Sequence, residues 1–159
     1  MTSASTPVIG PSRCNCAALR KASRRMSQFY DSVLAPCGLK STQYAMLTEI
    51  ARQGAAPPTI RELAEVLVMD QSTIGQNLRP LEREGLVALV QDEADRRSRR
   101  ITLTKVGRSR FAAAEPLWRV AQERFEGGFG RRAAADLRAV LGTIARDPSL
   151  ADAGEGSLR

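Results

Sequence analysis

The sequence predicts a mainly α-helical protein (class α+β) in which two short strands interrupt a succession of helices. Apolar residues recur at steps of three and four along most of the chain, which is the spacing of a helical face. Only residues 86–90, a short β-like run, and residues 101–104, which alternate, depart from that spacing. With 159 residues, the chain is long enough for one domain with its own core.

The first predicted helix covers residues 16–33, and Pro36 and Gly38 end it. A second helix begins near Ser41 and continues to Gly54. Both segments carry an apolar face at helical spacing. We therefore expect each of them to pack that face against other parts of the chain.

Two short helices follow, and each begins at a capping residue. Thr59 and Glu62 have the spacing of a capping box, which starts a helix over residues 60–67. Asp70 is a favourable N-cap for a helix over residues 71–84. We expect the two helices to pack across each other through four apolar side chains: Leu63, Leu67, Ile74 and Leu78.

The two strands enclose a charged loop over residues 92–100, and a long helix follows them. Thr104 is placed to cap this helix, and Pro116 is expected to kink it. A last helix carries apolar residues near the carboxyl end of the chain. The long helix is expected to end before it at three glycines: Gly127, Gly128 and Gly130.

This order of elements predicts a winged helix-turn-helix with long N- and C-terminal dimerisation helices. The apolar faces of the first and the last two helices are too long for the small central domain to cover, which indicates a partner surface and a homodimer. We expect five segments: a disordered tail over 1–12, a helical dimerisation region over 13–36 and 105–147, a winged helix-turn-helix DNA-binding domain over 41–104, and a flexible tail over 148–159.

The helix over residues 71–84 is the expected recognition helix, because its polar face carries side chains that read DNA. Amides pair with adenine, arginine pairs with guanine, and hydroxyls near a helix start suit a phosphate. Pro80 is expected to bend the second half of this helix. A solvated surface is the alternative for the polar face. The predicted contact residues are Gln71, Ser72, Thr73, Gln76, Asn77 and Arg79.

The charged loop predicts a second DNA contact, because four of its last five residues are arginines. An arginine at a hairpin tip can enter a narrow minor groove or meet phosphates, although a charge run can also be merely solvated. Asp95 is expected to orient an arginine side chain within the loop. The predicted wing contacts are Arg96, Arg97 and Arg99.

Composition narrows the function further. The 24 basic residues exceed the 17 acidic ones, for a net charge of +7, which favours polyanionic partners. The absence of histidine excludes the common histidine-dependent catalysis and histidine-ligated zinc, so we expect no enzyme, no catalytic residue and no cofactor. Without an apolar stretch long enough for a membrane span or an export signal, we expect a cytoplasmic protein with reduced thiols.

Four stretches of sequence form a recognisable set of motifs: the helix over 60–67, Asp70-Gln71-Ser72-Thr73, Leu81-Glu82-x-x-Gly85-Leu86-Val87, and Asp95-x-Arg97 followed by Leu103-Thr104-x-x-Gly107. Through these motifs the chain resembles the MarR family of bacterial regulators over residues 14–146. The resemblance implies a symmetric dimer on a palindromic operator in double-stranded DNA, and usually repression that a small phenolic compound or an oxidant relieves. Val68, in the turn, is a departure, because helix-turn-helix proteins often have glycine there.

The effector stays open between two classes. Cys14 and Cys16, at the head of the first helix, are candidate redox residues, and the peroxide-sensing branch of the family has a reactive cysteine near Cys16. Arg20 and Ser41 stand where that branch has tyrosines, and Cys16 could equally be a packing residue. Metal binding by the cysteines, Cys37 included, lacks a fourth ligand, so we expect no metal. A small aromatic ligand is the other class, with a candidate pocket at Arg20, Tyr30, Met46 and Trp118.

We therefore expect a dimeric DNA-binding transcriptional regulator, in the first instance a repressor. The alternatives are a thiol-based peroxide sensor that uses Cys16 and an architectural DNA-binding protein without sequence preference.

Overall fold

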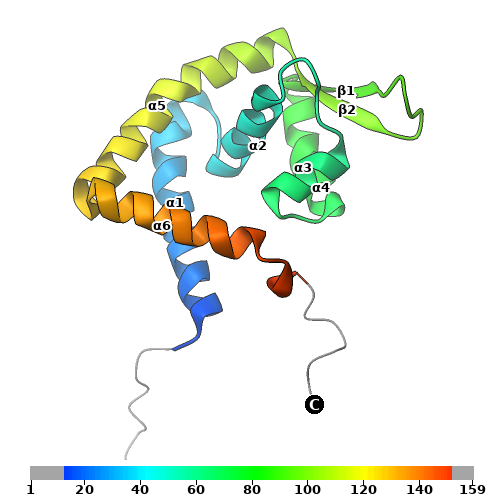
Figure 1. Ribbon diagram of the computed structural model, residues 1–159. Coiled ribbons are helices and arrows are strands. Elements are labelled where there is room, and N and C mark those ends of the chain that lie inside the picture. Colours follow the sequence, from blue (N-terminus) through cyan, green and yellow to red (C-terminus); the bar gives the residue numbers. More distant parts are fainter. Residues whose placement is uncertain (1–12, 152–159) are drawn as a thin grey trace, which may run out of the picture.

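The computed structural model describes residues 13–151 and confirms a mainly helical fold with one small sheet (Figure 1). The predicted disordered tail over 1–12 lies outside the described residues, as do residues 152–159. The helices are α1 (Asn15–Leu34), α2 (Ser41–Arg52), α3 (Ile60–Leu67), α4 (Gln71–Arg83), α5 (Lys105–Phe129) and α6 (Arg131–Arg146). The strands are β1 (Val87–Gln91) and β2 (Arg99–Leu103), and the 3₁₀ helices are η1 (Ala35–Cys37) and η2 (Pro148–Leu150).

The segment from α2 to β2, here called the winged-helix region, surrounds one apolar core. Helix α3 packs on α4 as predicted, with Leu63, Ile74 and Leu78 buried and Leu67 partly buried. The core also includes Leu34 at the end of α1 and Ala114 in α5, so those two helices are anchored on it. Removing these side chains from water is the main stabilising term for the region.

Both predicted helix caps are present. The Thr59 hydroxyl accepts from the Glu62 amide at 3.2 Å, and the Thr59 amide donates to a Glu62 carboxylate oxygen at 2.8 Å. Asp70 accepts from the Thr73 amide at 2.8 Å. Between α3 and α4, Val68 adopts the left-handed conformation with φ of 53°, and within residues 13–151 it is the only residue other than glycine with a positive φ.

The strands β1 and β2 form an antiparallel hairpin in which Val87 faces Leu103 and Gln91 faces Arg99. At its base, the Thr104 hydroxyl accepts from the Gly107 amide at 2.9 Å, which caps α5 as predicted. Gly107 has to be glycine here, because a Cβ atom would lie 1.8 Å from the Leu86 carbonyl oxygen. The threonine and glycine of the Leu-Thr-x-x-Gly motif thus join α5 closely to the start of the hairpin.

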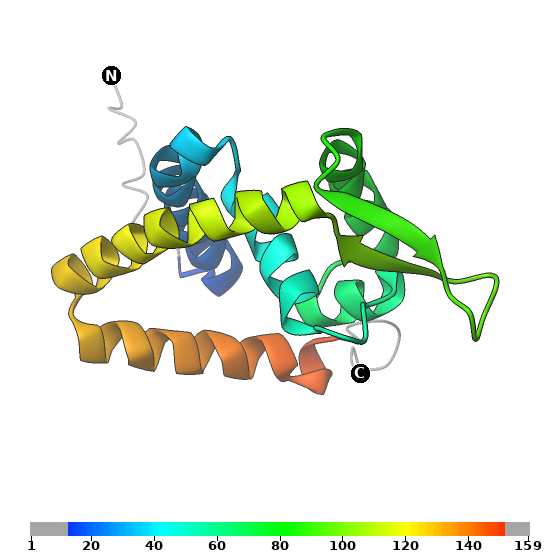
Figure 2. The same cartoon turned by 90° about the horizontal axis from the view of Figure 1, so that it is seen from above.

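Helices α1, α5 and α6 form what we call the helical arm. Helix α5 continues through Pro116 and follows a curved path away from the hairpin (Figure 1). It also continues through Gly127 and Gly128, so the expectation that all three glycines end it is wrong, and only Gly130, with φ of 95°, does so. Glycine weakens a helix without ending it when the neighbouring residues keep their hydrogen bonds. Helix α6 then runs back below the rest of the molecule and is separated from α1 (Figure 2).

Residues 148–150, the first three of the expected flexible tail over 148–159, form η2. Asp147 caps this turn, accepting from the Ser149 amide at 2.9 Å and from its hydroxyl at 2.6 Å. Within residues 13–151, none of the helices combines the length and apolar character that a membrane span requires.

Candidate nucleic-acid interface

Helix α4 separates an apolar face from a polar one. Ile74, Leu78 and Leu81 point into the core, and the six predicted recognition residues lie on the remaining surface. The exposed ones are Gln71, Ser72, Gln76 and Arg79, and the partly exposed ones are Thr73 and Asn77. Helix α4 continues through Pro80 to Arg83. The structure therefore brings the predicted recognition residues together on one accessible helix face.

The Asp70 carboxylate caps the amino-terminal end of α4 through several hydrogen bonds. Asp70 accepts hydrogen bonds from the Ser72 hydroxyl at 2.5 Å, the Thr73 hydroxyl at 2.6 Å and the Thr73 amide at 2.8 Å. These bonds, the one from Ser72 first, hold the pKa of Asp70 well below its ordinary value. Asp70 thus occupies the Thr73 amide as the predicted N-cap, and this amide is not free to donate to a phosphate.

Three of the four wing arginines face solvent together. Arg96, Arg97 and Arg99 are exposed, and together with Leu89 and Gln91 they line a shallow pocket with a volume of about 480 Å³. Among the described residues, none of these three guanidinium groups forms an ion pair. The wing therefore presents three guanidinium groups that are available to a phosphate backbone.

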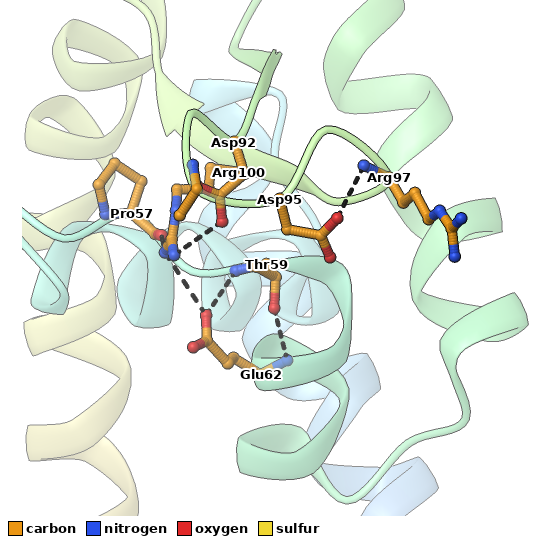
Figure 3. A network of polar contacts seen from close by, with 8 residues as sticks. Pro57, Thr59, Glu62, Asp92, Asp95, Arg97 and Arg100 are labelled. Atoms are coloured by element: carbon orange, nitrogen blue, oxygen red, sulfur yellow. Dashed lines mark hydrogen bonds and ion pairs between the residues drawn. The ribbon is translucent and has the colours of Figure 1, made fainter.

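The fourth arginine, Arg100, points inward (Figure 3). Its guanidinium lies 2.9 Å from a carboxylate oxygen of the buried Asp92 and donates to the Pro57 carbonyl at 2.7 Å. The Ala94 amide and Arg100 lower the pKa of Asp92. The expectation for Asp95 is wrong, because its carboxylate accepts from the backbone amide of Arg97 at 2.9 Å and not from an arginine side chain.

The predicted effector pocket is only partly assembled. A cavity of about 390 Å³ lies between α1, α2 and α5, and Tyr30 and Trp118 are among its walls. Met46 is instead 2% exposed in the core, and Arg20 is exposed on α1 and does not line the cavity. The other lining residues, which sequence reasoning missed, are Leu34, Ser41, Tyr44, Ala45, Thr48, Glu49 and Arg52.

Aromatic packing and hydrogen bonds shape this cavity. The ring of Tyr44 stacks between Phe111 and Trp118, at centroid distances of 5.3 and 6.2 Å. The Tyr30 hydroxyl donates to a side-chain oxygen of Gln122, which joins α1 to α5. Burial raises the pKa of both tyrosines, so their hydroxyls stay protonated near neutral pH. The cavity thus combines apolar and aromatic walls with hydroxyl groups and with the charged side chains of Glu49 and Arg52.

The three cysteines do not gather. Cys14 and Cys16 are exposed at the start of α1, where the Cys14 sulfur accepts from the Ala17 amide at 3.4 Å. Cys37 follows the opposite end of this 20-residue helix, and its thiol donates to the Leu34 carbonyl at 3.0 Å. A helix of that length spans about 30 Å, which is too far for the three thiols to share one metal ion.

Comparisons with known proteins agree with this geometry. Residues 38–98 match the MarR family. The DNA complex of the MosR regulator from Mycobacterium tuberculosis superimposes with a TM-score of 0.72 at 36% identity, over 84% of this chain and 96% of that one. A DNA complex of the repressor CouR, a protein of Rhodococcus jostii, superimposes with a TM-score of 0.75 at 28% identity, over 84% and 93% of the two chains.

Two curated relatives match over shorter segments. BadR of Rhodopseudomonas palustris, a transcriptional activatory protein, is 39% identical over 72 residues, which are 45% of this chain and 41% of BadR. The regulator HosA of Escherichia coli is 35% identical over 91 residues, which are 56% of this chain and 64% of HosA. The chain thus spans less than two thirds of the length of these curated relatives.

The matches cover the same elements that carry the candidate interface. The family match extends from the turn before α2 to the wing loop, and the likeness to MosR includes most of the helical arm as well. The polar face of α4 and the arginine-rich hairpin thus lie on a fold that this chain shares with DNA-bound regulators. From these findings, the chain belongs to the MarR family of winged-helix transcriptional regulators.

Proposed function

We propose that this protein is a sequence-specific DNA-binding transcriptional regulator without enzymatic activity. The observation that carries the proposal is the pairing of two accessible surfaces: the polar face of α4 and the three unpaired arginines of the wing. Side chains on α4 read base edges in the major groove, and the wing arginines contact phosphates or the minor groove. The proposed contacts are Gln71, Ser72, Thr73, Gln76, Asn77, Arg79, Arg96, Arg97 and Arg99.

The regulator acts as a homodimeric repressor on a palindromic operator. Residues 41–104 bind DNA, and residues 13–36 and 105–147 form the dimer. Support for the dimer comes from the apolar side chains that α6 leaves exposed, among them Val140 at 57%. CouR is a repressor and BadR an activatory protein, and the likeness to CouR covers more of this chain, so repression is the proposed direction.

Selection of bound duplexes from a random pool, followed by sequencing, tests the proposal directly. We expect a palindrome with half-sites about one helical turn apart, because two recognition helices would be related by a two-fold axis. Arg97→Gln should weaken binding about tenfold on all sequences and reduce the slope of log affinity against log salt by about 1.

Arg132→Gln is the matched control, because Arg132 is exposed at the far end of the arm and the substitution removes the same charge. A pool without any enriched sequence would establish an architectural DNA-binding protein instead. An equal loss of affinity and slope in both variants would show that only net charge matters, and the wing contact would be refuted.

A small aromatic ligand in the cavity between α1, α2 and α5 relieves repression. The cavity lies where α5 and α1 meet the winged-helix region, so a ligand there can favour one orientation of the recognition helix over another. The exposed Cys16 thiol supports an alternative in which an oxidant is the signal.

Release of labelled operator by phenolic acids, acyl thioesters and peroxides separates these two effectors. We expect a phenolic compound to release DNA from the parent protein and from Cys16→Ser alike. Ala45→Leu adds bulk to a wall of the cavity and should raise the required concentration about tenfold, whereas Ala112→Leu, on a part of α5 that does not line the cavity, should not. Release by peroxide that Cys16→Ser abolishes would establish the oxidant and refute the aromatic ligand.

A further inference from the structure

We propose that Arg100 is a positioning residue that holds the wing against the start of α3 and does not itself contact DNA. The inference rests on the proposed function, because it assigns the wing a geometry suited to its role there. It also separates Arg100 from the other three arginines of the loop, although the sequence places all four within five residues.

The Arg100 guanidinium connects three parts of the winged-helix region. One nitrogen lies 2.9 Å from Asp92, at the end of β1, and the other donates to the Pro57 carbonyl at 2.7 Å and lies 3.8 Å from Glu62 in α3. Two-thirds of the Arg100 side chain is buried, since 33% of it is exposed, and Asp92 is 10% exposed. Asp92 would be a nearly buried, uncompensated charge without this partner, which is a costly state.

Backbone contacts fix the same place. The Ile101 amide donates to the Pro58 carbonyl at 2.8 Å, and Thr59 forms a β-bridge with Arg100. Thr59 is also the N-cap of α3, and its amide donates to Glu62. The base of the wing and the first turn of α3 therefore share residues, and α3 in turn packs on the recognition helix α4.

The consequence is a wing that is ordered before DNA arrives. Asp92 also accepts from the Ala94 amide at 3.0 Å, and its own amide donates to the Ser98 carbonyl at 3.0 Å. The Arg100–Asp92 pair thus anchors the first turn of the loop that carries Arg96 and Arg97. A preordered loop loses less conformational entropy on binding, so its arginines contribute more of their attraction to affinity.

The test compares Arg100→Gln with Arg99→Gln, which removes the same charge from the neighbouring, outward-facing residue. Operator affinity is measured over a range of salt concentrations, and hydrogen exchange of the hairpin amides is measured in the free protein. We expect Arg100→Gln to bind about tenfold more weakly with an unchanged salt slope, and Arg99→Gln to lose about 0.9 of slope. Exchange at Asp92, Ala94 and Ser98 should accelerate only in Arg100→Gln.

Asp92→Asn gives a second, independent test of the inference, which can be carried out even if Arg100→Gln does not fold. This variant removes a negative charge from the DNA-binding side, so electrostatics alone predicts tighter binding. Positioning predicts weaker binding and faster hairpin exchange.

A loss of slope in Arg100→Gln equal to that in Arg99→Gln would overturn the inference, and so would unchanged hairpin exchange or tighter binding by Asp92→Asn. If Arg99→Gln and Arg97→Gln both bind operator normally, the wing contact of the proposed function fails. The exchange measurement still decides the role of Arg100 in that case.

Discussion

Helices α4 and α6 have similar lengths and similar apolar spacing but opposite surroundings. Helix α4 has 13 residues and buries Ile74, Leu78 and Leu81, whereas α6 has 16 residues and buries only Ala134. The apolar side chains of α6 fall at helical intervals along one face and stay exposed: Leu137, Val140, Leu141 and Ile144, at 36 to 57%. A single chain therefore buries the apolar face of α4 in the winged-helix region and leaves the apolar face of α6 in the helical arm exposed.

The difference teaches where each region obtains its stability. A stripe of leucine, valine and isoleucine on a helix costs free energy in water unless another surface covers it. Within residues 13–151, α6 packs against α5 and leaves that stripe uncovered. In the homodimer that we propose, a second copy of the chain covers this stripe in a two-fold arrangement, because the same stripe is present on both copies.

The largest expected effect follows from placing a charge in this stripe. Leu141→Glu should convert the dimer to monomers, because a carboxylate buried between two apolar helices lacks a partner. Operator affinity should fall by about 100-fold or more, since two tethered half-site contacts become independent. Sedimentation gives the mass of the protein, and titration of labelled operator gives its affinity.

Val66→Glu is the control for this variant, because Val66 is 52% exposed on α3, outside the arm. It makes the same kind of change and should leave the dimer mass unaltered. If Leu141→Glu still sediments as a dimer, the exposed stripe of α6 is not the dimer interface. The stripe would then be covered by something other than a second copy of the chain.

The parts of the fold that could be predicted from the sequence are those set by interactions between residues close together in the chain. The amino-terminal ends of α3 and α4 follow from Thr59, Glu62 and Asp70, whose capping contacts involve residues two or three positions away. The recognition residues on α4 follow from helical period once the buried face is known. Their contacts with DNA remain predictions.

The rest depends on contacts between distant segments. Arg100 is bound by Pro57, which lies 43 positions away, and no local pattern predicts that partner. Strand alternation offered one signal, because Arg99 and Arg100 must face opposite sides of β2. The cavity likewise joins α1, α2 and α5, so Met46 could be assigned to the core only after packing was known.

The smallest expected effect concerns an exposed apolar residue in the winged-helix region. Val68 is 67% exposed, but its position reflects backbone geometry: a β-branched residue adopts φ of 53° at the end of α3. The left-handed conformation costs about 1–2 kcal/mol for such residues, while glycine adopts it freely and loses about 0.5–1 kcal/mol through its unfolded-state freedom. Val68→Gly should therefore raise the free energy of unfolding by about 0.5–1 kcal/mol, as measured by urea denaturation.

Val66→Gly makes the same substitution two residues earlier, inside α3, and should lower stability by about 0.5 kcal/mol, because glycine has a lower helix propensity than valine. The Val68 amide donates to the Ala64 and Glu65 carbonyls, and glycine preserves both bonds, so the difference between the variants isolates backbone strain. Neither variant should change the dimer mass. If Val68→Gly is less stable than the parent protein, the Val68 side chain contributes to stability, as expected if a partner covers it. The contrast between the winged-helix region and α6 would then not hold at this turn.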